Sequence, residues 1–412
     1  MSPIAALDEH ASPLAILAEN IHPSADGILS AAGFRVERIA GALEGPALAE
    51  AAARAQILGI RSKSTIGSGE FRSPGGLLAI GCFCIGTNQV NLHAAEVNGV
   101  PVFNAPFANT RSVAELTVAE AVCLCRRTFS QSVKLHAGGW DKSAAGSHEV
   151  RGRTLGIIGY GHIGSQVSVL AESLGMRVLY YDISRKLALG NAQPCATLDE
   201  LLAASDVVTL HVPATSMTER MIGAPQLQRM RRGAHLINNA RGSVVDYAAA
   251  AAALRDGVLG GLAADVFPEE PARNGEVFAT PLQSLDNVIL TPHVGGSTAE
   301  AQEAIAVEVA EKLAAYWRHG ATHSAVNFPG VDLPHLREGE TRIMHVHRNV
   351  PGVLGRMHTL LAAQGVNINA EFLQSTRETS YVILDTELVR DRAVLQALAA
   401  MPETIRMRVM RL

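Results

Sequence analysis

Three glycines at the first, third and sixth positions of one short run, Gly159-Tyr160-Gly161-His162-Ile163-Gly164, have the spacing that most clearly predicts chemistry. The apolar run 155–158 before them is typical of a buried strand, and the residues after them have helical periodicity. Such a turn lets the backbone approach a pyrophosphate, and the following helix offers N–H groups and its positive dipole end to the anion. The run therefore predicts a dinucleotide-binding turn rather than an ordinary glycine-rich one.

Asp182 lies 18 residues after Gly164, at the end of the next expected strand, 178–181. Its carboxylate can accept hydrogen bonds from both hydroxyls of a ribose, which is the usual role of an acid at this spacing. It would also repel the additional phosphate of NADP, since two unit charges about 4 Å apart at an effective dielectric near 20 interact with about 4 kcal/mol. We therefore predict NAD as the cofactor, although Arg185 and Lys186 are near enough to weaken the preference.

Hydride transfer to NAD requires a base for the hydroxyl proton and a cation for the substrate carboxylate and carbonyl. Arg241, Glu270 and His293 follow three successive expected strands, and ligands of open α/β sheets bind at the carboxyl ends of strands. Each residue by itself could be a surface ion pair, a loop acid or a buried histidine. Their joint placement favours an active site, and spacing alone leaves Glu269 as an alternative to Glu270.

The elements that must position these residues form three regions. The first region has aliphatic runs at 14–18, 56–60 and 77–80 that alternate with alanine-rich, helix-like stretches. The second has strand candidates at 154–158, 177–181, 206–212, 234–238, 261–266 and 287–291. Strands that alternate with helices predict βαβ units and parallel sheets, hence an α/β fold.

After Gly295 and Gly296, a long helix is expected, with Ser297 and Glu300 as its capping box. Its apolar face repeats at every fourth residue, as in Ala301, Ile305, Val309, Leu313 and Trp317. We expect this helix to return to the first region. The third region predicts strand 342–347, helix 352–364, strands 367–374 and 381–387, helix 391–401 and strand 404–412, a ferredoxin-like βαββαβ module.

Composition excludes several classes of function. The net charge of −4 without a long basic run makes nucleic acid an unlikely partner. We expect no secretory signal and no membrane span, and hence a cytoplasmic protein. The five cysteines are an odd number and predict no disulfide framework. Cys82 with Cys84, and Cys123 with Cys125, are spaced more closely than usual zinc ligands, so we expect no metal site.

Three runs resemble the signature segments of the D-isomer-specific 2-hydroxyacid dehydrogenases. They are Asn239-Ala240-Arg241-Gly242, Asp265-Val266-Phe267-Pro268-Glu269-Glu270-Pro271 and Thr291-Pro292-His293-Val294-Gly295-Gly296. Supporting runs lie at 79–88, 104–115 and 324–329, and the resemblance is weakest in the first 50 residues and around 70–76. The chain is most similar to shorter bacterial members that oxidise D-3-phosphoglycerate and have a C-terminal ACT domain.

The resemblance implies that Arg241 binds the substrate, that His293 is the acid/base and that Glu270 holds its imidazole. It implies a flavodoxin-like substrate domain (1–107 and 296–335), a Rossmann domain that binds NAD (108–295) and an ACT domain (339–412). The implied NAD-binding residues are Gly159, Gly161, His162, Ile163, Gly164, Asp182, Val212, Pro213, Asn239, Ala240, Arg241, Asp265, His293, Gly295 and Gly296.

A phosphorylated substrate needs cations away from the reacting carbon, and Arg61-Ser62-Lys63 after the strand 56–60 would suit a phosphate unless it is only an exposed basic loop. The resemblance adds Gly86, Asn109 and Arg241 as substrate contacts. It implies NAD-dependent oxidation of 3-phosphoglycerate to 3-phosphohydroxypyruvate, the first step of L-serine biosynthesis. Alternatives are another D-2-hydroxyacid dehydrogenase, a 2-oxoglutarate reductase or, from a different class, an NADH-sensing corepressor-like protein.

The C-terminal module is expected to bind an effector. In the resembling enzymes L-serine binds where His347, Asn349 and Asn367 lie, which implies allosteric feedback inhibition. His345 shares a strand face with His347, so a metal is an alternative ligand of this pair. Trp140 matches a subunit contact of the family, and a second contact between ACT domains would make a homotetramer.

Overall fold

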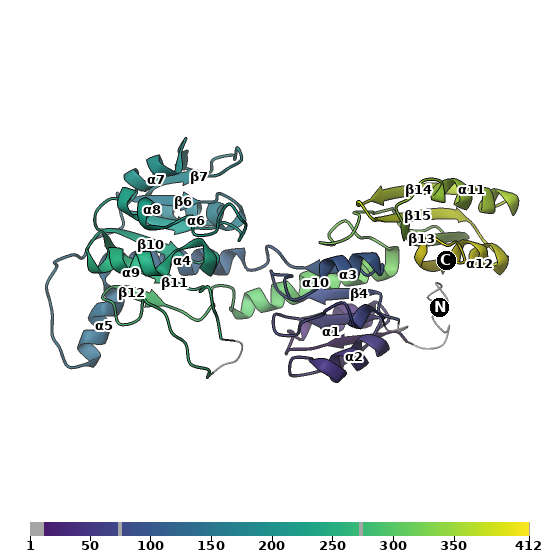
Figure 1. Ribbon diagram of the computed structural model, residues 1–412, viewed down its shortest axis with the longest axis horizontal. Coiled ribbons are helices and arrows are strands. Elements are labelled where there is room, and N and C mark those ends of the chain that lie inside the picture. Colours follow the sequence, from purple (N-terminus) through teal and green to yellow (C-terminus); the bar gives the residue numbers. More distant parts are fainter. Residues whose placement is uncertain (1–11, 73–75, 272–274, 412) are drawn as a thin grey trace. The chain divides into compact units, whose positions relative to one another are not determined.

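The computed structural model describes residues 12–72, 76–271 and 275–411, and the chain divides into two compact units (Figure 1). One unit is Asn109–Ala301, and the other combines Met1–Ala108 with Gln302–Leu412. Each is described by itself below.

The unit Asn109–Ala301 contains a seven-stranded, fully parallel sheet in the order β12-β11-β10-β9-β6-β7-β8. This is the Rossmann strand order with one additional strand. The strands are β6 (Thr154–Ile158), β7 (Arg177–Tyr181), β8 (Gln193–Pro194), β9 (Val207–Leu210), β10 (Ala234–Asn238), β11 (Leu259–Ala264) and β12 (Val288–Leu290). The helices are α4 (Thr110–Arg126), α5 (Thr128–His136), α6 (His162–Ser173), α7 (Leu198–Ala204), α8 (Ala224–Arg229) and α9 (Tyr247–Arg255).

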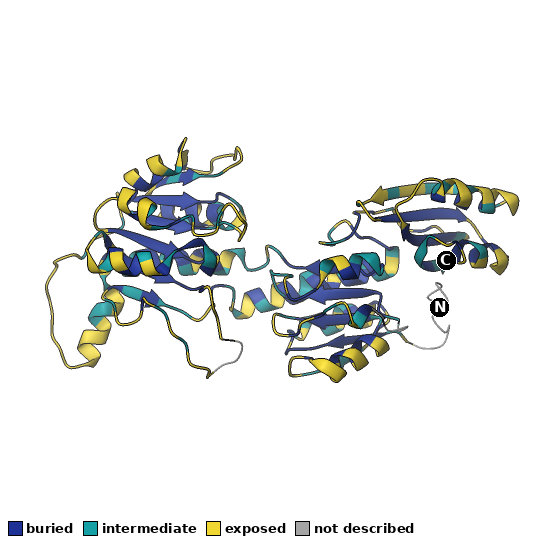
Figure 2. Ribbon diagram, in the orientation of Figure 1, coloured by how far each residue is buried: buried dark blue, intermediate teal, exposed yellow. Residues whose placement is uncertain are grey.

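Helices cover both faces of this sheet because successive strand residues point to opposite sides. Ile157 packs in one apolar cluster with residues of α4 and α6, whereas Ile158 packs in another with residues of α7 and α9. The strands read as continuous aliphatic runs for this reason, and both faces are buried (Figure 2).

Three strands of this sheet end earlier than the sequence predicts. β9 stops at Leu210 instead of residue 212, β11 runs over Leu259–Ala264 instead of 261–266, and β12 runs over Val288–Leu290 instead of 287–291. The start of β11 contains Gly260 and Gly261, which weaken a strand pattern. Asp265 therefore lies just beyond the strand, in the turn that faces the site.

In the other unit, a five-stranded parallel sheet has the flavodoxin-like order β2-β1-β3-β4-β5. Its strands are β1 (Leu14–Leu17), β2 (Arg35–Arg38), β3 (Ile57–Ile60), β4 (Ala79–Cys82) and β5 (Val102–Asn104). The helices beside it are α1 (Ser24–Ala31), α2 (Gly45–Arg54), α3 (Leu92–Val97) and α10 (Ala299–His319).

The prediction that α10 returns to the first region is confirmed, since Ile305, Val309 and Leu313 share an apolar cluster with Ala15 and Leu17 of β1. The predicted N-cap is wrong by one residue. The hydroxyl of Thr298, not Ser297, accepts the N–H of Ala301, at 3.1 Å.

The C-terminal module of this unit is a four-stranded antiparallel sheet in the order β14-β15-β13-β16. Its elements are β13 (Glu340–Arg348), α11 (Val353–Ala363), β14 (Ile368–Ser375), β15 (Thr379–Glu387), α12 (Arg392–Ala399) and β16 (Thr404–Arg411). The predicted βαββαβ order is confirmed, and Leu412 lies outside the described residues. A buried ion pair joins Arg342 to Asp385 through two contacts of 2.6 Å, and Arg342 also donates to the carbonyl of His319 at the end of α10.

No helix in the described part of the chain is long and apolar enough to cross a membrane. The five cysteines are all free thiols. Among the residues that the structure describes, no three His, Cys, Asp or Glu side chains are grouped as they would be around a metal ion.

Candidate active site

The glycine turn follows β6 and leads into α6, and its three glycines meet different constraints. Gly159 has φ +91°, and a Cβ there would overlap the carbonyl of His211. A Cβ on Gly164 would overlap the carbonyl of Gly159. Over Gly161 there is open space within 4 Å. The outer glycines therefore permit the turn and the close helix–strand packing, while the middle one leaves room for an anion to approach the backbone.

The N-terminus of α6 is the electrostatic part of this turn. Gly161 is its N-cap, in an extended conformation and without a side-chain cap. Peptide N–H groups and the positive end of the helix dipole thus face the space above Gly161. The arrangement fits the diphosphate of a dinucleotide.

Asp182 follows β7 and is hydrogen-bonded to the turn itself. Its Oδ2 accepts the N–H of Tyr160 at 2.9 Å, and its Oδ1 accepts the N–H and the hydroxyl of Ser184, each at 2.9 Å. The carboxylate is therefore held beside the glycine turn, where a ribose diol would lie. These contacts support the residue's predicted role and add a positioning bond that spacing did not reveal.

Val212 and Pro213 follow β9, Asn239 and Ala240 follow β10, and Asp265 follows β11.

Asp265 is 2% exposed and accepts three hydrogen bonds. They come from the hydroxyl of Thr291 at 2.6 Å, the N–H of Val294 at 2.8 Å and the N–H of Gly295 at 2.7 Å. Asp265 thus anchors the segment that carries His293, a role that the sequence did not indicate.

His293 and Glu270 form the predicted pair. Nδ1 of His293 lies 2.8 Å from Oε2 of Glu270, and the other carboxylate oxygen accepts the N–H of Phe267 at 3.0 Å. Glu270, not the adjacent Glu269, therefore makes this contact. His293 has φ +55°, an uncommon left-handed conformation for a non-glycine residue, which aims its ring from the turn after β12.

The electrostatics of the pair suit a proton carrier. The hydrogen bond with Glu270 raises the pKa of His293 above its ordinary value, against the opposing effect of burial. Burial acts to raise the pKa of Glu270, but its hydrogen bonds with His293 and Phe267 outweigh this and lower it. Glu270 thus remains a carboxylate, and Nε2 of His293 is the ring nitrogen left for a substrate.

Arg241 lies near both members of the pair. Its positive charge lowers the pKa of Glu270 and opposes protonation of His293. Its Nη1 donates to the carbonyl of Ala240 at 2.7 Å, and the side chain is exposed. A Cβ on the next residue, Gly242, would overlap the backbone of Phe267, so this glycine permits the Arg241 and Glu270 loops to touch.

The predicted phosphate residues belong to the other unit, at the carboxyl ends of β3 and β4. Gln89 Nε2 donates to the carbonyl of Arg61 at 2.6 Å and to that of Gly86 at 3.3 Å, which brings these two segments together. The carboxylate of Glu19 accepts the N–H of Lys63 at 3.0 Å and that of Ser64 at 2.8 Å. Ser62 and Lys63 are exposed.

Asn109 belongs to the unit Asn109–Ala301, which contains the glycine turn and is called the cofactor unit below, and it precedes α4. It lies against Gly296, since a Cβ on that glycine would overlap the Asn109 amide.

The three predicted effector residues do not meet within one chain. His347 is the second-to-last residue of β13 and Asn349 directly follows the strand, whereas Asn367 precedes β14. Both strands run antiparallel to β15, so they are parallel to each other, and the carbonyl of Asn367 binds the N–H of Glu387 beside the start of β13. Asn367 therefore lies at the opposite end of the sheet from His347.

His345 and His347 contact each other, with their Nδ1 atoms 3.2 Å apart. Burial lowers the pKa of both imidazoles to about 4. The contact is thus a hydrogen bond between neutral rings, and the described residues offer no third ligand for a metal.

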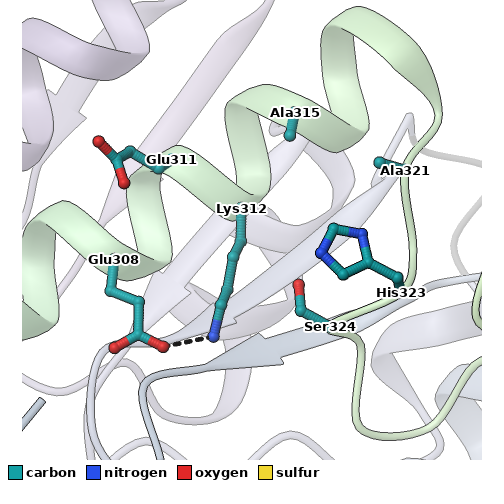
Figure 3. Close-up of a pocket in the computed structure, with 7 residues that line it drawn as sticks. All are labelled: Glu308, Glu311, Lys312, Ala315, Ala321, His323 and Ser324. Atoms are coloured by element: carbon teal, nitrogen blue, oxygen red, sulfur yellow. Dashed lines mark hydrogen bonds and ion pairs between the residues drawn. The ribbon is translucent and has the colours of Figure 1, made fainter. Parts of the chain in front are cut away.

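Figure 3 shows a pocket in the same unit. It is lined by Glu308, Glu311, Lys312, Ala315, Ala321, His323 and Ser324. Its lysine is already bound, with Nζ 2.6 Å from Glu308 and 2.7 Å from the carbonyl of Asn104. It contains none of the predicted site residues.

Comparison with known proteins supports the same interpretation. Residues 118–295 match the family described as D-isomer specific 2-hydroxyacid dehydrogenase, NAD binding domain, and residues 343–406 match an AHAS small subunit-like ACT domain. A protein of Escherichia coli (strain K12) named D-3-phosphoglycerate dehydrogenase is 51% identical over 398 residues, which are 96% of this chain and 97% of that one. Its namesake from Haemophilus influenzae is 49% identical over 396 residues, 96% of each chain.

Among solved structures, D-lactate dehydrogenase from Aquifex aeolicus, complexed with NAD and lactic acid, is 27% identical with a TM-score of 0.63. The match covers 73% of this chain and 95% of that one. The family match gives the cofactor as NAD, and the glycine turn with Asp182 beside it fits NAD, so the chain is an NAD-dependent oxidoreductase. By sequence and by fold, it belongs to the D-isomer-specific 2-hydroxyacid dehydrogenase family.

Proposed function

We propose that the chain oxidises D-3-phosphoglycerate to 3-phosphohydroxypyruvate with NAD, as the first step of L-serine biosynthesis. The names of its curated relatives support this substrate. The observation that carries the chemistry is the 2.8 Å contact between His293 and Glu270, close to the charge of Arg241.

In this mechanism, Arg241 binds the substrate carboxylate and polarises the oxygen at C2, which suits a planar guanidinium. Nε2 of neutral His293 accepts the proton of the C2 hydroxyl as the C2–H bond breaks. Glu270 stabilises the imidazolium that forms. NAD, when bound at the glycine turn, supplies the acceptor for the hydride.

The cofactor contacts proposed here are those implied by the sequence. The turn 159–164 would hold the diphosphate, and Asp182 would bind the ribose. The segments that follow β9, β10, β11 and β12 would line the nicotinamide side, because they lie at the same edge of the sheet as the glycine turn.

For the substrate phosphate, we propose Arg61, Ser62 and Lys63, with Gly86 and Asn109 holding the remainder of the molecule. Ser62 and Lys63 are exposed, and the backbone N–H groups of Lys63 and Ser64 donate to the Glu19 carboxylate, which fixes the loop; both observations support this proposal. The domain ranges 1–107 with 296–335, 108–295 and 339–412 would then bind substrate, NAD and effector.

We propose L-serine as a feedback inhibitor, bound by His347 and Asn349 of one chain and Asn367 of a second copy. The hydroxyl of Thr404 donates to the Leu398 carbonyl, so it accepts from Nε2–H of His345 at 2.8 Å. Nδ1 of His345 must then accept from Nδ1–H of His347. This leaves Nε2 of His347 as an acceptor, suited to the ammonium or hydroxyl group of serine.

A homotetramer would use two surfaces. No residue of α5 is buried, and Phe129, Val133, Leu135 and Trp140 expose large apolar side chains there and in the following segment. β14 is an edge strand of the ACT sheet, available for pairing with another copy. The five free thiols suit a reducing compartment, and we propose a cytoplasmic location.

The deciding experiment is a steady-state assay of NADH consumption with 3-phosphohydroxypyruvate and, separately, with 2-oxoglutarate, each with and without L-serine. We expect the phosphorylated ketoacid to have the higher kcat/KM and serine to inhibit. A preference for 2-oxoglutarate, or equal rates with unphosphorylated 2-ketoacids, would overturn the substrate. Unchanged rates with serine would overturn only the proposal that L-serine is a feedback inhibitor.

A further inference from the structure

Glu120 is a buried acid to which the proposed mechanism assigns no role. It lies on α4, which packs against β10 and β11, and it is 3% exposed. Its Oε2 accepts from the amide nitrogen of Asn239 at 2.7 Å, while its Oε1 is buried and has no hydrogen-bond partner. Asn239 follows β10 and precedes Arg241 by two residues.

The orientation of the Asn239 amide follows from its other neighbour. The hydroxyl of Thr117 donates to the carbonyl of Val113 at 2.8 Å, so it must accept from Asn239, whose Nδ2 lies 3.0 Å away. Both hydrogens of Nδ2 are thus used, one toward Thr117 and one toward Glu120. The amide oxygen Oδ1 remains, and it too is buried without a partner.

We infer that Glu120 carries a proton at neutral pH and donates it from Oε1 to Oδ1 of Asn239, and that this acid–amide pair positions the turn that carries Arg241. One proton provides partners for both unpaired oxygens, and buried polar atoms are nearly always hydrogen-bonded. Glu120 is a positioning residue, since it acts through Asn239 and does not touch the reacting atoms.

The surroundings of Glu120 favour the neutral acid. Burial raises its pKa to about 8, the hydrogen bond from Asn239 opposes this, and the nearby carboxylate of Asp265 adds to it. Cys123, on the same helix, is the other titratable group coupled to it, and the described residues bring no cation to it. Asp265 itself receives three hydrogen-bond donors from the segment that carries His293. Glu120 and Asp265 are thus neighbouring acids that contact two different segments of the site, those of Arg241 and His293.

The pH dependence follows from the sign of this shift. The pKa of Glu120 is raised in the folded protein, so the pair is intact below that pKa and is lost as pH rises through it. An ionised Glu120 cannot donate and would face the oxygen of Asn239 with a negative charge. The turn at Arg241 should then relax, and kcat/KM should fall in alkaline solution.

The test is the variant Glu120→Gln in the full-length protein. Its amide can donate to Oδ1 and accept from Nδ2 of Asn239, so it keeps both bonds but does not titrate. In the oxidative direction, where His293 limits only the acidic side of the profile, we expect near-wild-type turnover at pH 7 and an alkaline decline displaced upward by at least about one pH unit. The matched control is Glu115→Gln on the exposed side of α4, which should leave the pH profile unchanged.

Infrared spectroscopy gives a readout that does not depend on the substrate. The wild-type protein at pH 7 should have a carboxylic-acid C=O band that disappears on titration to pH 10 and is missing in Glu120→Gln. Absence of this band from wild type, or an unchanged alkaline limb in a folded Glu120→Gln variant, would overturn the inference. These outcomes are distinct from failure of the proposed substrate, which the infrared titration does not involve.

Discussion

The two parallel sheets have the same kind of architecture but different turns after their first strands. After β6, glycines bring the backbone to an open space beside the N-terminus of α6. After β1, the corresponding turn contains Glu19 and Asn20, both left-handed, with φ of +61° and +51°. The Glu19 carboxylate accepts the N–H groups of Lys63 and Ser64. A parallel sheet supplies positions at its edge, and the residue types in each turn decide what binds there.

The comparison predicts different defects in the two units. Changes in the cofactor unit should affect NAD binding and the chemical step. Changes at the edge of the five-stranded sheet in the other unit should affect recognition of the substrate's phosphate.

The largest effect is expected from His293→Ala. Loss of the group that carries the proton should lower kcat by about 10² to 10⁴-fold, the usual contribution of general acid–base catalysis. Steady-state assays at saturating NADH and ketoacid measure it, and fluorescence titration of NADH should give a Kd that changes far less than kcat. His93→Ala, exposed in the other unit, is the control and should keep full activity. Near-wild-type turnover of His293→Ala would remove the proposed mechanism.

Gly159→Ala tests the turn itself. Its Cβ would overlap the His211 carbonyl at a positive φ, so NAD affinity should fall about 100-fold, equivalent to roughly 2.7 kcal/mol. The control is Gly33→Ala, which has a positive φ of +95° but no atom within 4 Å of the new Cβ. It should lower Tm slightly and leave NAD binding intact. Equal NAD affinities of the two variants would contradict the steric argument.

Arg61→Ala tests the proposed phosphate site at the edge of the five-stranded sheet. A lost charged hydrogen bond is worth about 1.5–3 kcal/mol, so KM for 3-phosphohydroxypyruvate should rise roughly 10- to 100-fold. KM for an unphosphorylated 2-ketoacid should change little, and kcat should stay close to wild type. Equal changes in the two KM values would show that Arg61 does not select the phosphate.

The smallest effect is a displacement of a pH profile in Glu270→Gln. The hydrogen bond with Glu270 is the main cause of the raised His293 pKa, so the variant should titrate at lower pH. Oxidation needs neutral His293 and declines as pH falls through that pKa. The acidic limb of kcat/KM should therefore move to lower pH, with a lower overall rate. Glu269→Gln is the matched control, and a displacement there instead would reassign the pair.

Most strands were predictable because both faces of the two parallel sheets are buried, which makes their sequences continuously aliphatic. The exceptions have local reasons. β2 is an edge strand of sequence Arg-Val-Glu-Arg, whose charged ends resemble a loop, β5 has three residues, and the edge strand β8 has only two. The effector residues matched a family pattern, but sheet topology separates Asn367 from His347.

The sequence by itself determined the glycine turn, the position of the acid Asp182 after the next strand, and the strand-end positions of Arg241 and His293. These depend on short spacings and on backbone conformations that few residue types adopt. Only the tertiary structure decided that Glu270 and not Glu269 contacts His293, and that Asp265 anchors the histidine segment. It also brought together Glu120 and Asn239, which are 119 residues apart. Such pairs depend on burial and on the distance between side-chain atoms, and both arise only when distant segments pack.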